Sequence, residues 1–194
     1  MIRHAARISR IVLVGLLLAS ATATKAASLP GDSVYQLQVP LVDQNAKTFN
    51  FASLRGQPRL VTMFYTSCAY MCPLIIDTTR MAERKLDDSQ RAKLSVLMVS
   101  FDAERDDPAA LKAQAEKRKI QSSRWTLART DAANVRKLAA VLGIQYRQLD
   151  DGEFNHSSVL LLLDAEGRIA ARSDVMGKID PDFIAAIKAV LDSN

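Results

Sequence analysis

The feature that most constrains the fold is a pair of cysteines, Cys68 and Cys72, which directly follows an apolar run. This run, residues 59–65, is rich in β-branched and aromatic side chains and predicts a buried strand. Pro73 comes next, and proline suits the first turn of a helix because its missing N–H would have no partner there. The pair is therefore expected on a strand-to-helix turn. Backbone N–H groups and the helix dipole favour negative charge at such a place, which increases the thiolate fraction of both cysteines.

These are the only 2 cysteines in a chain of 194 residues. A disulfide across so short a loop would remove little entropy from the unfolded chain, so it would stabilise the fold weakly. A reactive or metal-binding pair is therefore favoured over a purely structural disulfide. A zinc knuckle is disfavoured because no second cysteine pair completes four ligands.

Residues 1–27 have the pattern of a secretory signal peptide. Arg3, Arg7 and Arg10 precede a short apolar stretch at residues 11–19, and small residues suited to cleavage follow. A comfortable membrane span needs about 20 apolar residues, which this stretch lacks. An uncleaved N-terminal anchor is the alternative. Either case predicts a periplasmic or other exported location, membrane-anchored if the segment is retained, where cysteines can be oxidised.

The basic character of the chain lies mainly in this segment. Residues 1–26 contain four Arg or Lys and no acid, so their removal lowers the formal net charge from +5 to +1. The remaining domain has no basic excess that would indicate a nucleic-acid partner. It would contact a membrane only through an uncleaved anchor.

Residues 28–194 are expected to form one α/β domain. Strands are expected at residues 35–39 and 48–51, as a hairpin, and at 59–65, 94–101, 125–128, 157–163 and 168–172. Helices are expected at residues 73–85, 108–119, 132–142 and 181–192. This alternation predicts a central mixed β-sheet flanked by helices, with an N-terminal β-hairpin. A cysteine pair after the first central strand makes the arrangement similar to a thioredoxin-like fold, although thioredoxins have two residues between the cysteines rather than three.

His156 is expected to complete the site. It lies in a polar loop, residues 152–158, before a buried strand, and in a thioredoxin-like fold this loop faces the cysteine pair. Two thiolates and one imidazole form a soft, three-coordinate site that selects Cu(I), although Zn²⁺ could be held with an added water. Cu(II) would require further nitrogen or oxygen ligands, and Asp102 is one candidate. Met71 offers a soft sulfur, although a partly exposed apolar residue is its more ordinary interpretation.

Three motifs in this order resemble the Sco/SenC family of exported copper proteins. They are residues 64–73, residues 99–108 and the Asn-His-Ser-Ser stretch at 155–158. The resemblance implies copper bound by Cys68, Cys72 and His156. It also implies a role in assembling the dinuclear copper centre of cytochrome c oxidase, by delivering copper, by reducing the receiving cysteines, or both.

The chain departs from the family pattern at three positions. Ala69 and Tyr70 stand where the family commonly has Pro-Asp, and Ala103 replaces a proline of the second motif. These changes leave the ligands implied by the resemblance in place, but they leave the client protein open.

Three functions follow from these observations. The first is a metallochaperone that passes Cu(I) to an exported partner, such as a subunit of cytochrome c oxidase. The second is a thiol-disulfide oxidoreductase whose Cys68 and Cys72 reduce a thiol-containing client, and it does not require His156. The third is a peroxide-reducing or redox-sensing thiol protein, which would need an arginine near the reactive thiol, and the cysteine motif contains none.

Overall fold

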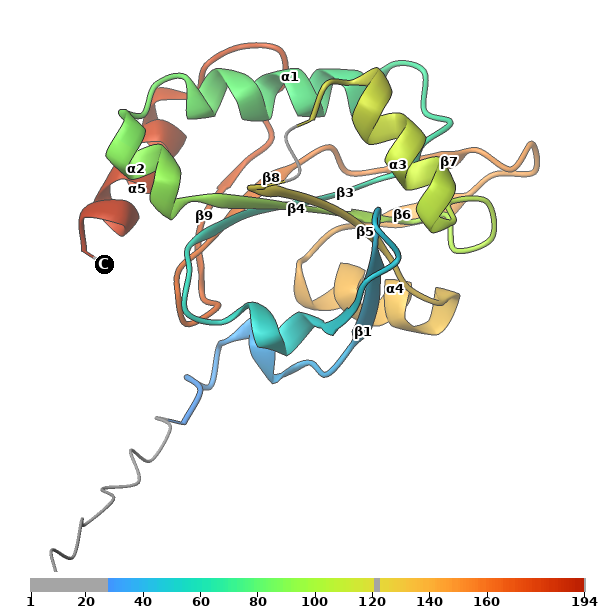
Figure 1. The fold of residues 1–194 in the computed structure, drawn as a ribbon, viewed down its shortest axis with the longest axis horizontal. Helices are drawn as coiled ribbons and strands as arrows, with labels where there is room; N and C mark the ends of the chain where they lie inside the picture. The colour runs from blue at the N-terminus through green and yellow to red at the C-terminus, as the bar shows by residue number, and fades with distance from the viewer. Residues whose placement is uncertain (1–27, 121–122, 194) are drawn as a thin grey trace, which may run out of the picture.

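A seven-stranded mixed sheet with helices on both faces forms the centre of the molecule (Figure 1). The structure is a computed structural model, and it describes residues 28–120 and 123–193. The predicted signal segment, residues 1–27, lies outside the described residues. No helix in the described part combines the length and the apolar character needed to cross a membrane.

The order of elements confirms the predicted alternation. The strands are β1 (Pro40–Asp43), β2 (Thr48–Asn50), β3 (Arg59–Phe64), β4 (Ser95–Ser100), β5 (Trp125–Arg129), β6 (Tyr146–Gln148), β7 (Phe154–His156), β8 (Leu160–Leu163) and β9 (Ile169–Ser173). The helices are α1 (Met71–Glu83), α2 (Asp88–Lys93), α3 (Pro108–Lys117), α4 (Ala132–Val141) and α5 (Pro181–Asp192), with short 3-10 turns η1 (Val34–Gln36) and η2 (Phe51–Leu54).

The sheet has a parallel centre and antiparallel margins. Its strand order is β2-β1-β5-β4-β3-β8-β9, with β3, β4 and β5 parallel and every other neighbouring pair antiparallel. All residues of β3 and β4 are buried, which explains why both appear in the sequence as nearly continuous apolar runs. Polar residues stand at the strand ends, and Thr62, a buried polar residue inside β3, donates its hydroxyl to the Val159 carbonyl at 2.7 Å. The predicted fold class, a mixed sheet flanked by helices in a thioredoxin-like arrangement, is confirmed.

The helices divide between the two faces of this sheet. Helices α1 and α3 lie on one side, and α4 lies on the other (Figure 1). This division follows from chain order, because the right-handed β3-α1-β4 and β4-α3-β5 crossovers place both helices on the same face. The cysteine turn then lies at the carboxyl end of β3, the edge where parallel α/β sheets place their sites.

The predicted strand at residues 35–39 is wrong. Residues Val34–Gln36 form the 3-10 turn η1 instead, and its cap Ser33 accepts the backbone N–H of Tyr35. Tyr35 is fully buried and packs edge-on against Phe51, with ring centroids 5.3 Å apart. Gly167 lies against the Tyr35 ring with a φ of 83°. The alternation of apolar residues that predicted a strand at 35–39 therefore comes from a folded loop, whose apolar side chains are buried without strand pairing.

The N-terminal hairpin exists, but its first strand lies later than predicted. It is formed by β1 and β2, with Leu41 opposite Phe49. Two further elements were not predicted. Helix α2 is short and wholly exposed or half-buried, so it has no apolar stripe to reveal it. The hairpin of β6 and β7 replaces the predicted loop before the third apolar strand, which itself is shorter than predicted and begins at Leu160.

Candidate metal centre

The two cysteines lie on the predicted strand-to-helix turn. Strand β3 ends at Phe64 and helix α1 begins at Met71, so Cys68 lies in the turn and Cys72 in the first turn of the helix. The helix begins two residues before the predicted start at Pro73. Cys72 is fully buried and Cys68 is 8% exposed, so only Cys68 reaches the surface. Both are free thiols in this structure.

The sulfur of Cys68 caps helix α1. The N-cap residue Tyr70 makes no side-chain capping bond, and the backbone N–H of Cys72 donates to Cys68 Sγ at 3.3 Å. Each of the other four described α-helices starts at an aspartate that accepts a backbone N–H; these caps are Asp87, Asp107, Asp131 and Asp180. A sulfur therefore occupies the position that a carboxylate oxygen takes elsewhere in the fold.

The two thiols differ in acidity. A hydrogen bond from the Cys72 thiol, together with the backbone N–H groups of Cys72, Tyr70 and Met71, lowers the pKa of Cys68 to about 4 against the opposing effect of burial. The pKa of Cys72 is raised because its thiol donates to Cys68 and because it is buried. The sequence predicts two acidified thiols, whereas the structure acidifies Cys68 alone. The pair therefore shares one proton near neutral pH.

His156 approaches the thiols from the hairpin of β6 and β7. It is the last residue of β7, opposite Tyr146 on β6, and its ring lies among aromatic side chains. The centroid of Phe101 lies 5.0 Å from that of His156, and the centroid of Tyr65 lies 6.0 Å away. His156 Nδ1 is 3.1 Å from the carbonyl oxygen of Ser157. A carbonyl only accepts, so Nδ1 carries the proton and Nε2 of the neutral ring keeps a lone pair for a metal.

These three side chains form a metal-ligand cluster. One ligand atom each from Cys68, Cys72 and His156 lies within 4.8 Å of the others, and in the described residues this is the one such group of three or more His, Cys, Asp or Glu. Two sulfurs and one imidazole nitrogen are a donor set that suits a soft ion such as Cu(I). The residues thus fit the metal that the sequence predicts.

The two further candidate ligands behave differently. Asp102 is buried and bonded to Arg105, whose side chain and backbone N–H both donate to its carboxylate, so it does not join the cluster. Met71 is 37% exposed and lines the same hollow as Cys68 and His156, a space of about 390 Å³. Tyr70, one of the residues that depart from the family pattern, lines this hollow too and is 86% exposed.

Sequence reasoning missed the buried acid nearest the turn, Asp106. It is 1% exposed and accepts the backbone N–H of Thr66 at 3.0 Å, the Thr66 hydroxyl at 2.5 Å and the Ser100 hydroxyl at 2.5 Å. Burial raises the pKa of Asp106, and the bonds from Ser100 and Thr66 oppose that rise. This carboxylate ties the residue that begins the cysteine turn to the end of β4. Its position within the second motif was the available signal, but spacing alone did not distinguish it from Asp102.

Comparison of the whole chain with known families gives one broad match. The sequence model of the SCO1/SenC family matches residues 30–192, which is nearly all of the described structure. Among individual relatives, a Stutzerimonas stutzeri protein whose name refers to copper binding is 31% identical over 75 residues, covering 39% of this chain and 37% of that protein. The matched region spans less than two thirds of the length of each of the first curated relatives.

Solved structures share the fold. Bradyrhizobium japonicum ScoI with copper bound superposes with a TM-score of 0.63 at 24% identity, covering 79% of this chain and 98% of that one. BsSco, described as a member of the Sco family of cytochrome c oxidase assembly proteins and as containing a disulfide switch, gives a TM-score of 0.68 at 18% identity, covering 81% and 94% of the two chains. At these identities the similarity establishes the thioredoxin-like architecture.

Proposed function

Because the chain belongs to the SCO1/SenC family, we propose that it binds Cu(I) through Cys68, Cys72 and His156 and passes the ion to an exported partner. The partner class is a protein whose copper centre is being assembled, with a subunit of cytochrome c oxidase as the leading example. In this proposal residues 1–27 direct export or anchor the domain, and residues 28–194 form the copper-binding unit.

One observation carries the proposal: two sulfurs and one imidazole nitrogen lie within 4.8 Å of one another. They come from three separate places, the cysteine turn, the first turn of α1 and the end of β7. A protein that needed only a disulfide would not require an imidazole there. The copper-bound state of the Bradyrhizobium protein, which shares this fold, supports the same cargo.

The residues are prepared for this cargo to different degrees. Cys68 is held as a thiolate near neutral pH, and the contact of His156 Nδ1 with the Ser157 carbonyl leaves Nε2 to face the metal. Cys72 keeps its proton until the ion arrives, because metal ligation requires a thiolate. Binding of Cu(I) should therefore release about one proton per chain. Cys68, the more exposed sulfur, is the ligand best placed to exchange with a partner's thiolate.

The difference between the two thiols also supports a second function, reduction of a client disulfide. The Cys68 thiolate would attack one client sulfur, forming a mixed disulfide and releasing the other client sulfur as a thiolate. Cys72, after losing its proton, would attack Cys68 Sγ and release the second client thiolate. The client gains two electrons and the chain ends as the Cys68–Cys72 disulfide. An accessible acidic thiol beside a buried one of raised pKa is the arrangement that this sequence of steps requires.

Anaerobic titration of the reduced protein with Cu(I), against a competing chelator, tests the first function. We expect saturation at one copper per chain. The Cys68→Ser/Cys72→Ser double variant should bind no copper in competition with the chelator. Equal copper retention by the wild-type protein and the double variant would contradict the proposal.

The His156→Ala variant separates the two functions. It removes one copper ligand but neither sulfur, so copper affinity should fall while the rate of reduction of a model disulfide stays close to that of the wild type. Equal losses of both activities would mean that His156 supports the structure of the turn instead of binding metal. Retained copper affinity would favour the oxidoreductase function.

A further inference from the structure

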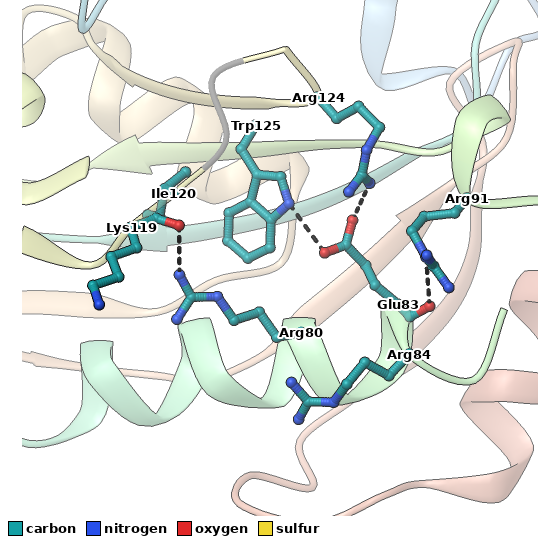
Figure 2. Close-up of a pocket in the computed structure, with 8 residues that line it drawn as sticks. All are labelled: Arg80, Glu83, Arg84, Arg91, Lys119, Ile120, Arg124 and Trp125. Carbon is teal, nitrogen blue, oxygen red and sulfur yellow. Dashed lines mark hydrogen bonds and ion pairs between the residues drawn. The ribbon is translucent and has the colours of Figure 1, made fainter. Parts of the chain in front are cut away.

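A second hollow lies beside the C-terminal end of α1, and Figure 2 shows the residues that line it. It measures about 450 Å³ and is lined by residues from the C-terminal ends of α1 and α3, the last turn of α2 and the start of β5; these are Arg80, Glu83, Arg84, Arg91, Lys119, Ile120, Arg124 and Trp125. Five of these eight side chains are cations and one is an acid. Cys72 and Glu83 lie near opposite ends of α1, about 17 Å apart along the helix axis at 1.5 Å per residue, so the hollow is separate from the metal centre.

The single acid of the hollow is already neutralised within the fold. Glu83 is 6% exposed, and its carboxylate accepts a hydrogen bond and ion pair from Arg124 and a bond of 3.1 Å from the indole N–H of Trp125 (Figure 2). Its charge is therefore not available to repel an incoming anion. The acid instead holds Arg124 and Trp125 at the wall of the hollow.

Two of the arginines serve the helix ends. Arg80 donates to the carbonyls of Arg118 and Lys119, at 3.2 Å for the latter, and Arg91 donates to the Glu83 carbonyl at 3.2 Å. These bonds satisfy carbonyls at the C-terminal ends of α3 and α1, where cations are favoured by the helix dipole. Asp77 and Asp88 further pair with Arg80 and Arg91, respectively. Helix capping thus accounts for these two arginines.

Capping does not account for Arg84 and Lys119. Neither side chain makes a hydrogen bond or ion pair with the residues described here, and both are exposed at the rim of the hollow. Lys119 also adopts a φ of 51°, a left-handed conformation that glycine or asparagine adopts more readily. The hollow therefore carries an excess of two positive charges after its internal pairs are counted.

We propose that this hollow binds a phosphate group as a dianion, with Arg84 and Lys119 supplying the uncompensated charge and Arg80 and Arg124 supplying further N–H donors. A phosphate monoester carries a charge of about −1.5 to −2 near neutral pH, which matches the excess. The size of the hollow lies within the range of about 300–1,000 Å³ found for small-ligand sites, so a small ligand is favoured over a flat protein surface. The phosphate group could belong to a soluble ligand or to a lipid head group.

The chain contains one tryptophan, and it lines this hollow, so its fluorescence reports on binding there. The full domain, residues 28–194, would be titrated with inorganic phosphate at low ionic strength, with sodium chloride of matched ionic strength in parallel. We expect a saturable change in emission with phosphate and none with chloride. The Arg84→Gln/Lys119→Gln variant should weaken binding by about a hundredfold or more, because it removes two charged hydrogen bonds that each contribute roughly a tenfold effect or more.

A matched control is the Lys85→Gln/Lys117→Gln variant. It also removes two positive charges, one near the C-terminal end of α1 and one at that of α3, but neither Lys85 nor Lys117 lines the hollow. This variant should bind phosphate like the wild type, and the charge-preserving Arg84→Lys/Lys119→Arg variant should retain binding. Melting temperatures of all variants would verify that each is folded.

Vesicles of phosphatidylcholine with and without phosphatidic acid identify the source of the phosphate group. If the wild-type protein sediments with vesicles that contain phosphatidic acid and the Arg84→Gln/Lys119→Gln variant does not, the site binds a lipid head group. A response to soluble phosphate without sedimentation would assign it to a soluble ligand. An equal phosphate response in that variant and in the Lys85→Gln/Lys117→Gln control would overturn the proposal, as would binding of polyglutamate without any response to phosphate. Cu(I) stoichiometry should be the same in all variants.

Discussion

The acidity of Cys68 is predicted to depend on its neighbour Cys72. The hydrogen bond from the Cys72 thiol is the largest contribution to the lowered pKa of Cys68, ahead of the three backbone N–H groups that also face its sulfur. The Cys72→Ala variant removes this one donor and leaves the backbone donors in place. It should therefore raise the pKa of Cys68 without returning it to the value of a free thiol.

The size of the effect follows from the type of bond that is lost. A hydrogen bond to a charged acceptor contributes about 1.5–3 kcal/mol. Because 1.36 kcal/mol corresponds to a tenfold change in proton affinity, the affinity of Cys68 for its proton should increase roughly ten- to hundredfold. The wild-type value of about 4 leaves room for such a rise below the pKa of an ordinary cysteine.

The assay is the pH dependence of alkylation by iodoacetamide, which reacts with thiolate. In Cys72→Ala the remaining thiol is Cys68, so the reaction reports one group. The Cys72→Ser variant is the control, because its hydroxyl keeps a donor at the same place and should leave the midpoint closer to that of the wild type. The reasoning is refuted if the Ala and Ser variants share one midpoint, since the backbone N–H groups would then account for the acidity by themselves.

Three further outcomes follow from the structure. Oxidation of Cys68 and Cys72 to a disulfide should abolish Cu(I) binding. By linkage, bound copper should shift the midpoint potential of the pair by about 30 mV in favour of the reduced form for each tenfold excess of copper over its dissociation constant. Thiol trapping in a redox titration with and without copper measures this shift, and identical midpoint potentials would show that copper does not use both sulfurs. Asp106→Asn replaces a carboxylate that accepts three hydrogen bonds by an amide, and it should lower the free energy of unfolding by about 1–3 kcal/mol. Urea titration measures this loss, and Asp107→Asn is a control outside this network. An unchanged unfolding midpoint would mean that the bonds from Asp106 to Thr66 and Ser100 do not stabilise the turn. Gly167→Ala should lower the free energy of unfolding by roughly 2–4 kcal/mol, because the added Cβ would lie 2.4 Å from the Tyr35 ring and the backbone φ there is 83°. The control is Gly31→Ala, whose added Cβ meets no atom within 4 Å. Similar melting temperatures for the two variants would contradict the packing argument.

The sequence predicted the centre of the fold because the strongest local signals coincide there. The run at 59–65 is buried on both sides, and the cysteine turn follows it directly, so both the strand and the helix start were recognisable. The strand predicted at residues 35–39 failed for a tertiary reason. Tyr35 is buried by Phe51 and by the approach of Gly167, a residue far along the chain, and local alternation carries no information about such contacts.

The site was predicted in its residue types more fully than in its electrostatics. Motif order indicated Cys68, Cys72 and His156, and the structure brings their ligand atoms together. The division of roles between the two sulfurs depends on which one faces the N–H groups of the turn, and spacing does not reveal that. The hairpin that carries His156 was missed because β6 and β7 have only three residues each, too few for a periodic pattern.

The sulfur cap of helix α1 gives this helix a property that the others lack. An aspartate at the start of α2, α3, α4 or α5 keeps its lone pairs under all physiological conditions. The sulfur of Cys68 instead loses its negative charge when it is alkylated or oxidised to a disulfide, and it shares a lone pair when it binds a metal, so it becomes a weaker hydrogen-bond acceptor. The first turn of α1 should therefore fray more once the sulfur is modified or bound. The rate at which the Cys72 amide proton exchanges with deuterium should rise accordingly, so this rate reports whether the thiolate is free.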